Sequence, residues 1–165
     1  MNLIAETNRL KIASFTSADT ELLYLLTSDE YVMRYFRGVL TYQETEHMLE
    51  KILKNYAEYD YCFWKVLNKV DEEFLGIAGV LYQEIGGTAE TEISYRIMRR
   101  YWNNGYATEA AAACKEYGTN ILGRKRLISL IRPGNIASKR VAEKLGASAS
   151  EMVVFEGAEH VLYLY

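Results

Sequence analysis

The chain has 165 residues, of which half are apolar and a quarter charged, and its formal net charge is −3. This composition is typical of a globular protein, and the length suits a single domain over residues 1–165 with a sizeable core. The acidic balance argues against general nucleic-acid binding, and no apolar run approaches the roughly 18 residues of a membrane helix, so neither nucleic acid nor a membrane is an expected partner.

The N-terminal segment MNLIAETNRLKI lacks the charged start and long apolar middle of a signal peptide, so a cytoplasmic location is expected. Two cysteines, Cys62 and Cys114, and two histidines, His47 and His160, are scattered along the chain. Their spacing matches no zinc site, so we predict no metal and expect both cysteines to be small buried apolar residues.

The first half of the chain predicts one strand followed by three helices. The strand covers residues 8–14, and the helices cover 21–28, 29–36 and 41–59. The third helix carries the clearest start signal, a capping box. In this motif the Thr41 side chain caps the helix, and Glu44 reaches back to the Thr41 backbone.

The second half predicts six strands and two helices. The strands cover 61–68, 74–84, 91–98, 126–132, 150–157 and 159–165, and the helices cover 106–122 and 135–145. Pro133 and Gly134 end the fourth of these strands, and Gly146 closes the second helix as a left-handed cap. The continuous apolar run RLISLIR favours a central strand that is buried on both faces.

Apart from the short turn of helix at 29–36, these elements follow the order β-α-α-β-β-β-α-β-α-β-β. The strand, helix and strand within 91–132 predict a parallel pair joined by a right-handed crossover. The hairpins predict antiparallel pairs. We therefore expect an α/β fold with a mixed sheet and helices on both of its faces.

The most informative segment is the turn between the strand at 91–98 and the helix at 106–122. It contains Asn103, Asn104 and Gly105, small residues that suit a tight turn. A helix that opens directly after such a turn leaves backbone N–H groups free at the positive end of its dipole. This arrangement predicts an anion site, and a phosphate is its usual guest.

The residues around this turn resemble those of the GNAT family of N-acetyltransferases. Residues 100–105 are similar to the family motif Q/R-x-x-G-x-G/A, although Asn103 replaces its first glycine. Residues 133–147 resemble a second family motif, which in the RimJ/RimL-type ribosomal-protein branch reads N-x-x-S-x-x-V-x-x-K-x-G. The matching residues are Asn135, Ser138, Val141, Lys144 and Gly146. Asn tolerates a positive φ better than other non-glycine residues, so the turn is expected to survive.

The resemblance implies a GNAT-like fold, with a mostly antiparallel sheet and a splayed parallel central pair, and acetyl-CoA as the acetyl donor. It places the backbone of Ile97 against the pantetheine arm of the donor. The turn then holds the pyrophosphate, and Asn135 and Ser138 face the pantetheine and the sulfur. The residues expected to bind acetyl-CoA are Ile97, Met98, Arg99, Arg100, Asn103, Asn104, Gly105, Tyr106, Ala107, Asn135 and Ser138.

Acetyl transfer to an amine requires a group that removes a proton from the ammonium form. Glu92 is the first candidate, and the alternatives are that it faces solvent or pairs with Arg96. Glu84 is the second candidate. Ser138 is expected either to protonate the departing thiolate or to form a hydrogen bond beside it. Many relatives carry a tyrosine one turn later, where this chain has Ala142.

The acceptor side is less defined by the sequence. By resemblance, its wall is formed by Tyr31, Arg34, Tyr35 and Phe36, although core packing explains these aromatic residues equally well. Glu109 lies in the first turns of the helix at 106–122, where a carboxylate suits the dipole, and we interpret it as structural.

The sequence therefore predicts an acetyl-CoA-dependent N-acetyltransferase that acts on a protein N-terminal amine or on a small amine. Two other functions compete with this interpretation. A catalytically silent acyl-CoA-binding module is suggested by Asn103 and Ala142, and a dinucleotide-binding oxidoreductase fails because the first strand lacks a G-x-G-x-x-G turn. The net charge is too small to identify the acceptor, and both a monomer and a homodimer fit the sequence.

Overall fold

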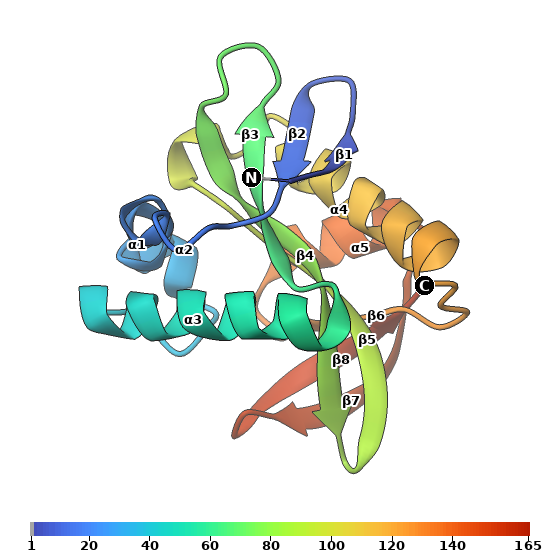
Figure 1. Ribbon diagram of the computed structural model, residues 1–165. Helices are drawn as coiled ribbons and strands as arrows, with labels where there is room; N and C mark the ends of the chain where they lie inside the picture. The colour runs from blue at the N-terminus through green and yellow to red at the C-terminus, as the bar shows by residue number, and fades with distance from the viewer. Residues whose placement is uncertain (1) are drawn as a thin grey trace.

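The computed structural model describes residues 2–165, whose eight strands form one mixed sheet (Figure 1). The strands lie in the order β1-β2-β3-β4-β5-β6-β8-β7, and among the pairs of this described part only β5 and β6 run parallel. The strands are β1 Leu3–Glu6, β2 Leu10–Ala13, β3 Phe63–Asn68, β4 Phe74–Ile85, β5 Thr88–Ile97, β6 Ile128–Ile131, β7 Ser148–Phe155 and β8 Ala158–Leu164. The expected α/β fold, mostly antiparallel with one parallel central pair, is confirmed.

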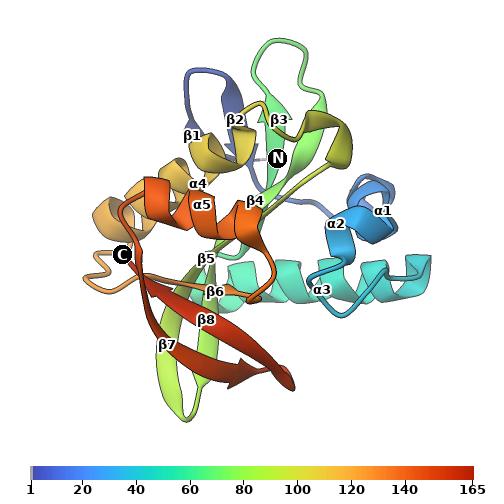
Figure 2. The ribbon, with the colours of Figure 1, turned by 180° about the vertical axis from the view of Figure 1, so that it is seen from behind.

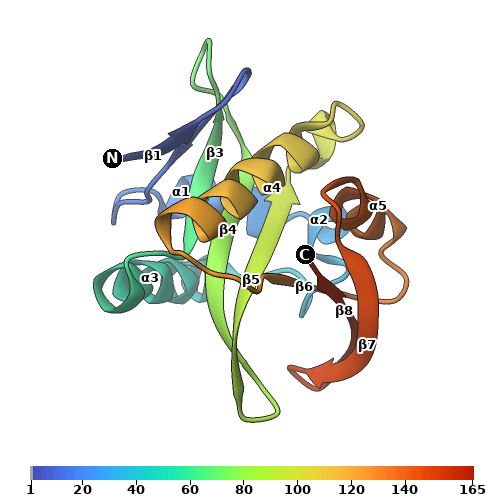
Figure 3. The same ribbon diagram turned by 90° about the vertical axis from the view of Figure 1, so that its right-hand side faces the viewer.

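Five α-helices cover the two faces of this sheet. They are α1 Thr20–Thr27, α2 Glu30–Met33, α3 Tyr42–Tyr59, α4 Tyr106–Glu116 and α5 Ile136–Lys144. Helices α1 to α3 lie on the face that is turned toward the viewer in Figure 1, and α4 and α5 lie on the face seen in Figure 2. Figure 3 shows α4 lying across β3 to β5, with α5 beside the β7–β8 hairpin.

The two-residue period of the strands divides the core between these faces. On β3, Phe63 and Leu67 pack with side chains of α1 to α3, whereas Trp64 and Val66 pack with the small residues of α4. The alanine run of α4 lets this helix approach the sheet closely. The two buried clusters fix the end of β5 between the helical layers.

Two features of the chain differ from the sequence prediction. Strand β1 was not predicted, and it pairs with β2 at the edge of the sheet. The helix expected over 106–122 ends as an α-helix at Glu116 and continues as the π-helical turn Tyr117–Ile121. Within residues 2–165, no helix combines the length and apolar character needed to cross a bilayer.

The local helix signals are confirmed. Thr41 and Glu44 form both hydrogen bonds of the capping box. Gly146 follows α5 with a φ of 87°, as expected for a left-handed cap. Helix α4 lies between β5 and β6 along the chain, so the parallel pair is joined by the expected helical crossover.

Gly76 lets β4 lie close to the end of β5, because a Cβ atom at this position would lie 2.1 Å from the backbone oxygen of Arg96. Its φ is also positive, at 149°. We therefore expect Gly76→Ala to lower the free energy of unfolding by roughly 2–4 kcal/mol, since a backbone clash is added to an unfavourable φ. Denaturant unfolding measures the change.

Gly86 is the matched control for this substitution. It has a φ of 56°, and a Cβ atom added there would have no neighbour within 4 Å, so only the backbone conformation is strained. Gly86→Ala should lower the stability by about 1 kcal/mol. Equal losses for the two variants would show that the close approach at Gly76 is unimportant.

Candidate active site

A cleft with a volume of about 420 Å³ lies between the α2 region, the end of β5 and the first turns of α4 and α5. A smaller cavity of about 40 Å³ adjoins it and extends between β5 and β6 toward β8. Tyr35, Phe36, Tyr95, Asn135 and Ser138 line both spaces. The cleft is within the size range of small-molecule sites and is the leading candidate for the functional site.

The cleft exists because β5 and β6 separate after a single registered pair, Glu92 opposite Ile128. The Met98 N–H donates to the Leu75 oxygen of β4 at 2.8 Å. Because backbone groups alternate sides along an antiparallel strand, the N–H and C=O of Tyr95 and Ile97 point away from β4, into the gap. An extended ligand can pair with the backbone there, as the resemblance implied for Ile97.

The turn after β5 presents free backbone donors to the cleft. Gly105 is the N-cap of α4 with a φ of 78°, and no side chain caps this helix. The N–H groups of Tyr106, Ala107 and Thr108 therefore have no acceptor within residues 2–165, and all three residues line the cleft. Unpaired donors at the positive end of a helix fit a pyrophosphate.

Asn103 lines the cleft and adopts the left-handed conformation expected at its position, with a φ of 62°. Asn104 is used differently, since its side-chain amide donates to the oxygens of Tyr101 and Trp102 at 3.2 and 2.9 Å. The Arg9 side chain also donates to the Asn104 oxygen at 2.9 Å. Asn104 therefore shapes the turn, whereas Asn103 faces the ligand space.

Glu109 has the structural role expected from the sequence. Its carboxylate accepts hydrogen bonds from the Thr7 hydroxyl at 2.6 Å and from the Arg9 backbone and side chain at 2.9 and 2.7 Å. Burial alone would raise the pKa of Glu109, but these hydrogen bonds outweigh it and hold the pKa below the usual value. The carboxylate thereby ties the first turn of α4 to the β1–β2 hairpin.

Arg99 and Arg100 do not line the cleft, and neither does Met98. The Arg99 guanidinium lies 3.6 Å from the centre of the Tyr31 ring, and Arg100 forms an ion pair with Glu73 at 3.0 Å. Cationic side chains of α5, Arg140 and Lys144, line the cleft instead. Arg140 was missed in the sequence, where its only signal is its place on the same helix face as Ala137 and Lys144.

The first turn of α5 is held by three hydrogen bonds. Asn135 accepts the Ser138 N–H at 3.2 Å, as an N-cap does. The Tyr95 hydroxyl donates to the Ser138 backbone oxygen at 3.0 Å, and the Tyr35 hydroxyl donates to Gly134 at 2.9 Å. These bonds fix the position of the Ser138 side chain, which faces both cavities.

Glu92 is buried in the wall of the smaller cavity, with 6% of its surface exposed. Gln83 donates to its carboxylate at 2.7 Å. Burial raises the pKa of Glu92 to about 7, while hydrogen bonds from Gln83 and the Leu130 backbone oppose the rise. Within the described residues Glu92 neither faces solvent nor forms an ion pair with Arg96, so the two alternatives considered for it are absent from this structure.

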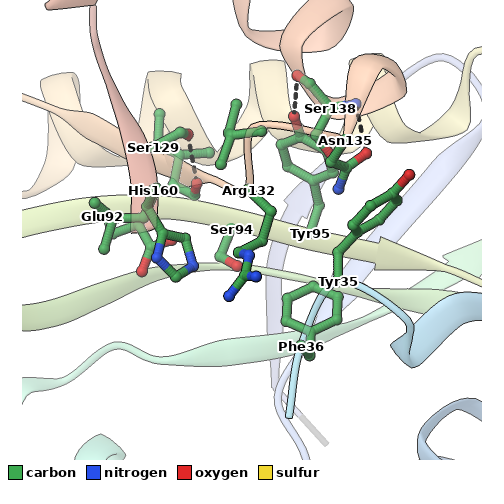
Figure 4. Close-up of a pocket in the computed structure, with 13 residues that line it drawn as sticks. Tyr35, Phe36, Glu92, Ser94, Tyr95, Ser129, Arg132, Asn135, Ser138 and His160 are labelled. Atoms are coloured by element: carbon green, nitrogen blue, oxygen red, sulfur yellow. Dashed lines mark hydrogen bonds between the residues drawn. The ribbon is translucent and has the colours of Figure 1, made fainter. Parts of the chain in front are cut away.

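Glu92 shares the smaller cavity with residues that the sequence did not single out. Figure 4 shows Ser94, Arg132 and His160 around the same space. They come from β5, the end of β6 and β8, which a linear sequence does not relate to one another. Within residues 2–165, no group of three His, Cys, Asp or Glu side chains is placed to hold a metal ion.

The four residues expected on the acceptor side line the cleft, but Glu84 does not. Tyr31, Arg34, Tyr35 and Phe36 all line the larger space. Glu84 is exposed near the β4–β5 hairpin, opposite Ala89, and lines neither cavity. Of the two carboxylates considered as a base, the structure therefore brings only Glu92 to the site.

Comparison with known proteins agrees with this geometry. Residues 9–148 match the family model described as Acetyltransferase (GNAT) domain. An uncharacterized protein of Bacillus subtilis, YkkB, is 37% identical over 89% of this chain and 86% of its own. An uncharacterized N-acetyltransferase of the same organism, YnaD, is 36% identical over 85% of this chain and 79% of its own.

Solved structures show the same fold. A GNAT-family acetyltransferase from Bacillus anthracis superposes with a TM-score of 0.79 at 28% identity, covering 100% of this chain and 96% of that one. RimL, a ribosomal alpha-N-protein acetyltransferase in complex with coenzyme A, superposes with a TM-score of 0.77 at 15% identity, covering 99% and 96%. The chain therefore belongs to the GNAT acetyltransferase family, whose members take the acetyl group from acetyl-CoA.

Proposed function

We propose that the protein transfers the acetyl group of acetyl-CoA to a primary amine that binds beside Glu92. One observation carries this proposal. A single strand, β5, leads from a buried carboxylate with a pKa of about 7 to a helix N-terminus with unpaired N–H groups, and the two features line adjoining cavities. Acetyl-CoA supplies the activated acetyl group as a thioester.

The larger cleft fits this donor. The N–H groups of Tyr106, Ala107 and Thr108 are placed to bind the pyrophosphate, and Arg140 and Lys144 add positive charge beside it. The backbone groups of Tyr95 and the N–H of Ile97 are suited to the pantetheine arm, whereas the Ile97 oxygen accepts a hydrogen bond from the Trp102 indole at 2.7 Å. An N–H in this gap is also suited to polarise the thioester carbonyl.

Glu92 is assigned the role of general base. An amine is protonated at neutral pH, so it must lose a proton before its lone pair forms the new C–N bond. A carboxylate with a pKa near 7 accepts this proton, directly or through a water molecule. As the C–S bond breaks, the thiolate needs a proton, and we assign the Ser138 hydroxyl as the group that donates it or forms a hydrogen bond to the sulfur.

A turnover screen tests the proposal. Purified protein is incubated with acetyl-CoA and a panel of small amines and peptides with free N-termini, and the release of coenzyme A thiol is followed. We expect at least one amine to accelerate thiol release in proportion to its concentration. Failure to bind acetyl-CoA at millimolar concentration would reject the proposal.

A silent acyl-CoA-binding module remains the second candidate. Asn103 occupies the place of a family glycine, and Ala142 is fully buried and offers no proton where many relatives carry a tyrosine. Such a module would bind acetyl-CoA but acetylate no member of the panel. Slow transfer or hydrolysis that disappears in Glu92→Gln would exclude it.

Two acceptor classes fit the proposed transfer, a protein N-terminal amine and a small amine. The match of Asn135, Ser138 and Lys144 to the RimJ/RimL-type motif, together with the structural likeness to RimL, supports a protein N-terminal amine. The aromatic wall at Tyr31, Tyr35 and Phe36 suits a peptide. The cytoplasmic location and the choice between monomer and homodimer stay predictions.

A further inference from the structure

Arg96 is the most unusual side chain of the acceptor side. It lies on the same face of β5 as Glu92 and Ser94, at the wall of the larger cleft. Its guanidinium lies 3.7 Å from the centre of the Phe36 ring and 5.4 Å from the centre of the Phe63 ring. Arg96 is therefore held between two aromatic rings that fix its position.

The Arg96 side chain is half-buried in the cleft wall, yet its guanidinium lacks the partners that a charge withdrawn from water normally requires. Among residues 2–165 it forms no ion pair, and its side-chain hydrogen bond goes to the Met33 sulfur at 3.7 Å, a weak acceptor. Its Nε atom is buried without any hydrogen-bond partner. Even partial burial of a cation is costly, and an anion that pairs with it offsets this cost.

The charges around Arg96 leave the acceptor side positive. Burial lowers the pKa of Arg96 to about 10, while Glu92 and Glu156 oppose this change, so the side chain stays charged at neutral pH. Arg37 already holds the Glu156 carboxylate at 3.2 Å. Arg132 lines the adjoining cavity and has no side-chain hydrogen bond or ion pair in the described part of the chain.

The net charge of the residues that line the cavities is therefore opposite in sign to the net charge of the whole chain. The net charge of the chain is −3, yet the charged residues that line the two cavities are five cations and one carboxylate, Glu92. The cations are Arg34, Arg96, Arg132, Arg140 and Lys144. The phosphates of the donor account for the two cations on α5, but they leave the three arginines of the acceptor side unexplained.

We propose that the amine acceptor carries a carboxylate, which forms a bidentate ion pair with Arg96 while the amine lies toward Glu92. The inference rests on the proposed acetyl transfer and specifies its substrate class. Arg96 and Glu92 are four residues apart on one strand, a span of roughly 13 Å between their backbones. A peptide with an acidic residue near its N-terminus separates the two groups along this span, whereas a free amino acid holds both on one carbon and reaches Glu92 through a water molecule.

The test uses binding, so that it does not depend on turnover. The protein is saturated with coenzyme A, which lacks the acetyl group, and acceptor affinity is measured by isothermal titration calorimetry. One arm compares alanine with alaninamide. The other compares the C-terminally amidated peptides Ala-Asp-Ala and Ala-Asn-Ala, so the two arms distinguish a free amino acid from an acidic peptide.

At least one carboxylate probe is expected to bind about tenfold or more tightly than its amide counterpart. Arg96→Met, which keeps the length but removes the charge, should bring this ratio to about one. Arg96→Lys should retain part of the preference, because the charge remains and the planar fork is lost. The ratio of the two affinities is measured within each variant. A partly unfolded sample lowers the binding of both probes alike and therefore does not change this ratio.

Arg124→Gln is the control, since Arg124 is exposed in the loop after α4 and contacts the Tyr61 hydroxyl at 3.5 Å. It should keep the full preference. The inference would be overturned if neither carboxylate probe binds, or if neither binds more tightly than its amide counterpart. This holds even if the protein acetylates amines. A carboxylate preference that is lost in Arg96→Met, but without turnover of any amine in the panel, would support a carboxylate site at Arg96 and reject the proposed acetyl transfer.

Discussion

Glu92→Gln is expected to lower kcat/KM for acetyl transfer by about 100- to 10,000-fold, the range typical of losing a general base. The substitution keeps the size of the side chain and a hydrogen-bond acceptor for Gln83, but it removes the group that takes the proton from the ammonium. Initial rates of thiol release measure the change. Glu50→Gln, an exposed change on α3, is the matched control and should keep the wild-type rate.

The pH dependence distinguishes this role from simple damage to the site. Because Glu92 acts as a base only when ionised, kcat/KM of the wild-type protein should rise with pH and level off above a pKa of about 7. Glu92→Gln should lose this transition. A variant that keeps the same transition, or most of the activity, would contradict the assignment.

The same substitution should stabilise the fold. The pKa of Glu92 is raised to about 7 from an ordinary value of 4.5, so the buried charge destabilises the native state increasingly as the pH rises through this window. Above about pH 8, Glu92→Gln should therefore raise the free energy of unfolding by up to about 3 kcal/mol. Denaturant unfolding near pH 8 and near pH 4 measures it, and the gain should vanish at the lower pH.

Gly105→Val is expected to weaken acetyl-CoA binding by about 100-fold or more. Gly105 has a φ of 78°, which a β-branched residue rarely adopts, and it is the N-cap that orients the free N–H groups of α4. A displaced turn would misplace the donors intended for the pyrophosphate. Isothermal titration calorimetry with acetyl-CoA measures the loss.

Gly123 offers a matched control, because it also has a positive φ but does not line the cleft. Its φ is 61°, and a Cβ atom there would have no neighbour within 4 Å. Gly123→Val should therefore lower the stability but leave acetyl-CoA affinity unchanged. If both variants bind acetyl-CoA as tightly as the wild type, the helix N-terminus is not the pyrophosphate site.

Features encoded by neighbouring residues were predictable from the sequence. The capping box at Thr41 and Glu44 and the left-handed cap at Gly146 depend on local hydrogen bonds and backbone freedom, and both are confirmed. The parallel strands around α4 followed from the strand–helix–strand order. The edge strand β1 was missed because none of its four residues is buried and the segment shows no clear alternation.

The environment of charged residues was not predictable in the same way. Strand periodicity placed Glu92 and Arg96 on one face of β5, but it does not say which side chains cover that face. Glu92 and Arg96 are surrounded by Gln83 of the neighbouring strand β4, by Phe36 and by β8, and of these Phe36 and β8 lie far away in the sequence. The raised pKa of Glu92 and the unpaired state of Arg96 are therefore properties of the folded chain.

The most direct test of acetyl transfer to an amine is to quantify both products in one reaction. Wild-type protein is supplied with acetyl-CoA and its best acceptor from the amine and peptide panel, and the thiol and the acetylated amine are measured together. We predict equal amounts of both, with formation of both strongly reduced in Glu92→Gln. Thiol released without acetylated amine, or no reaction despite bound acetyl-CoA, would contradict the account.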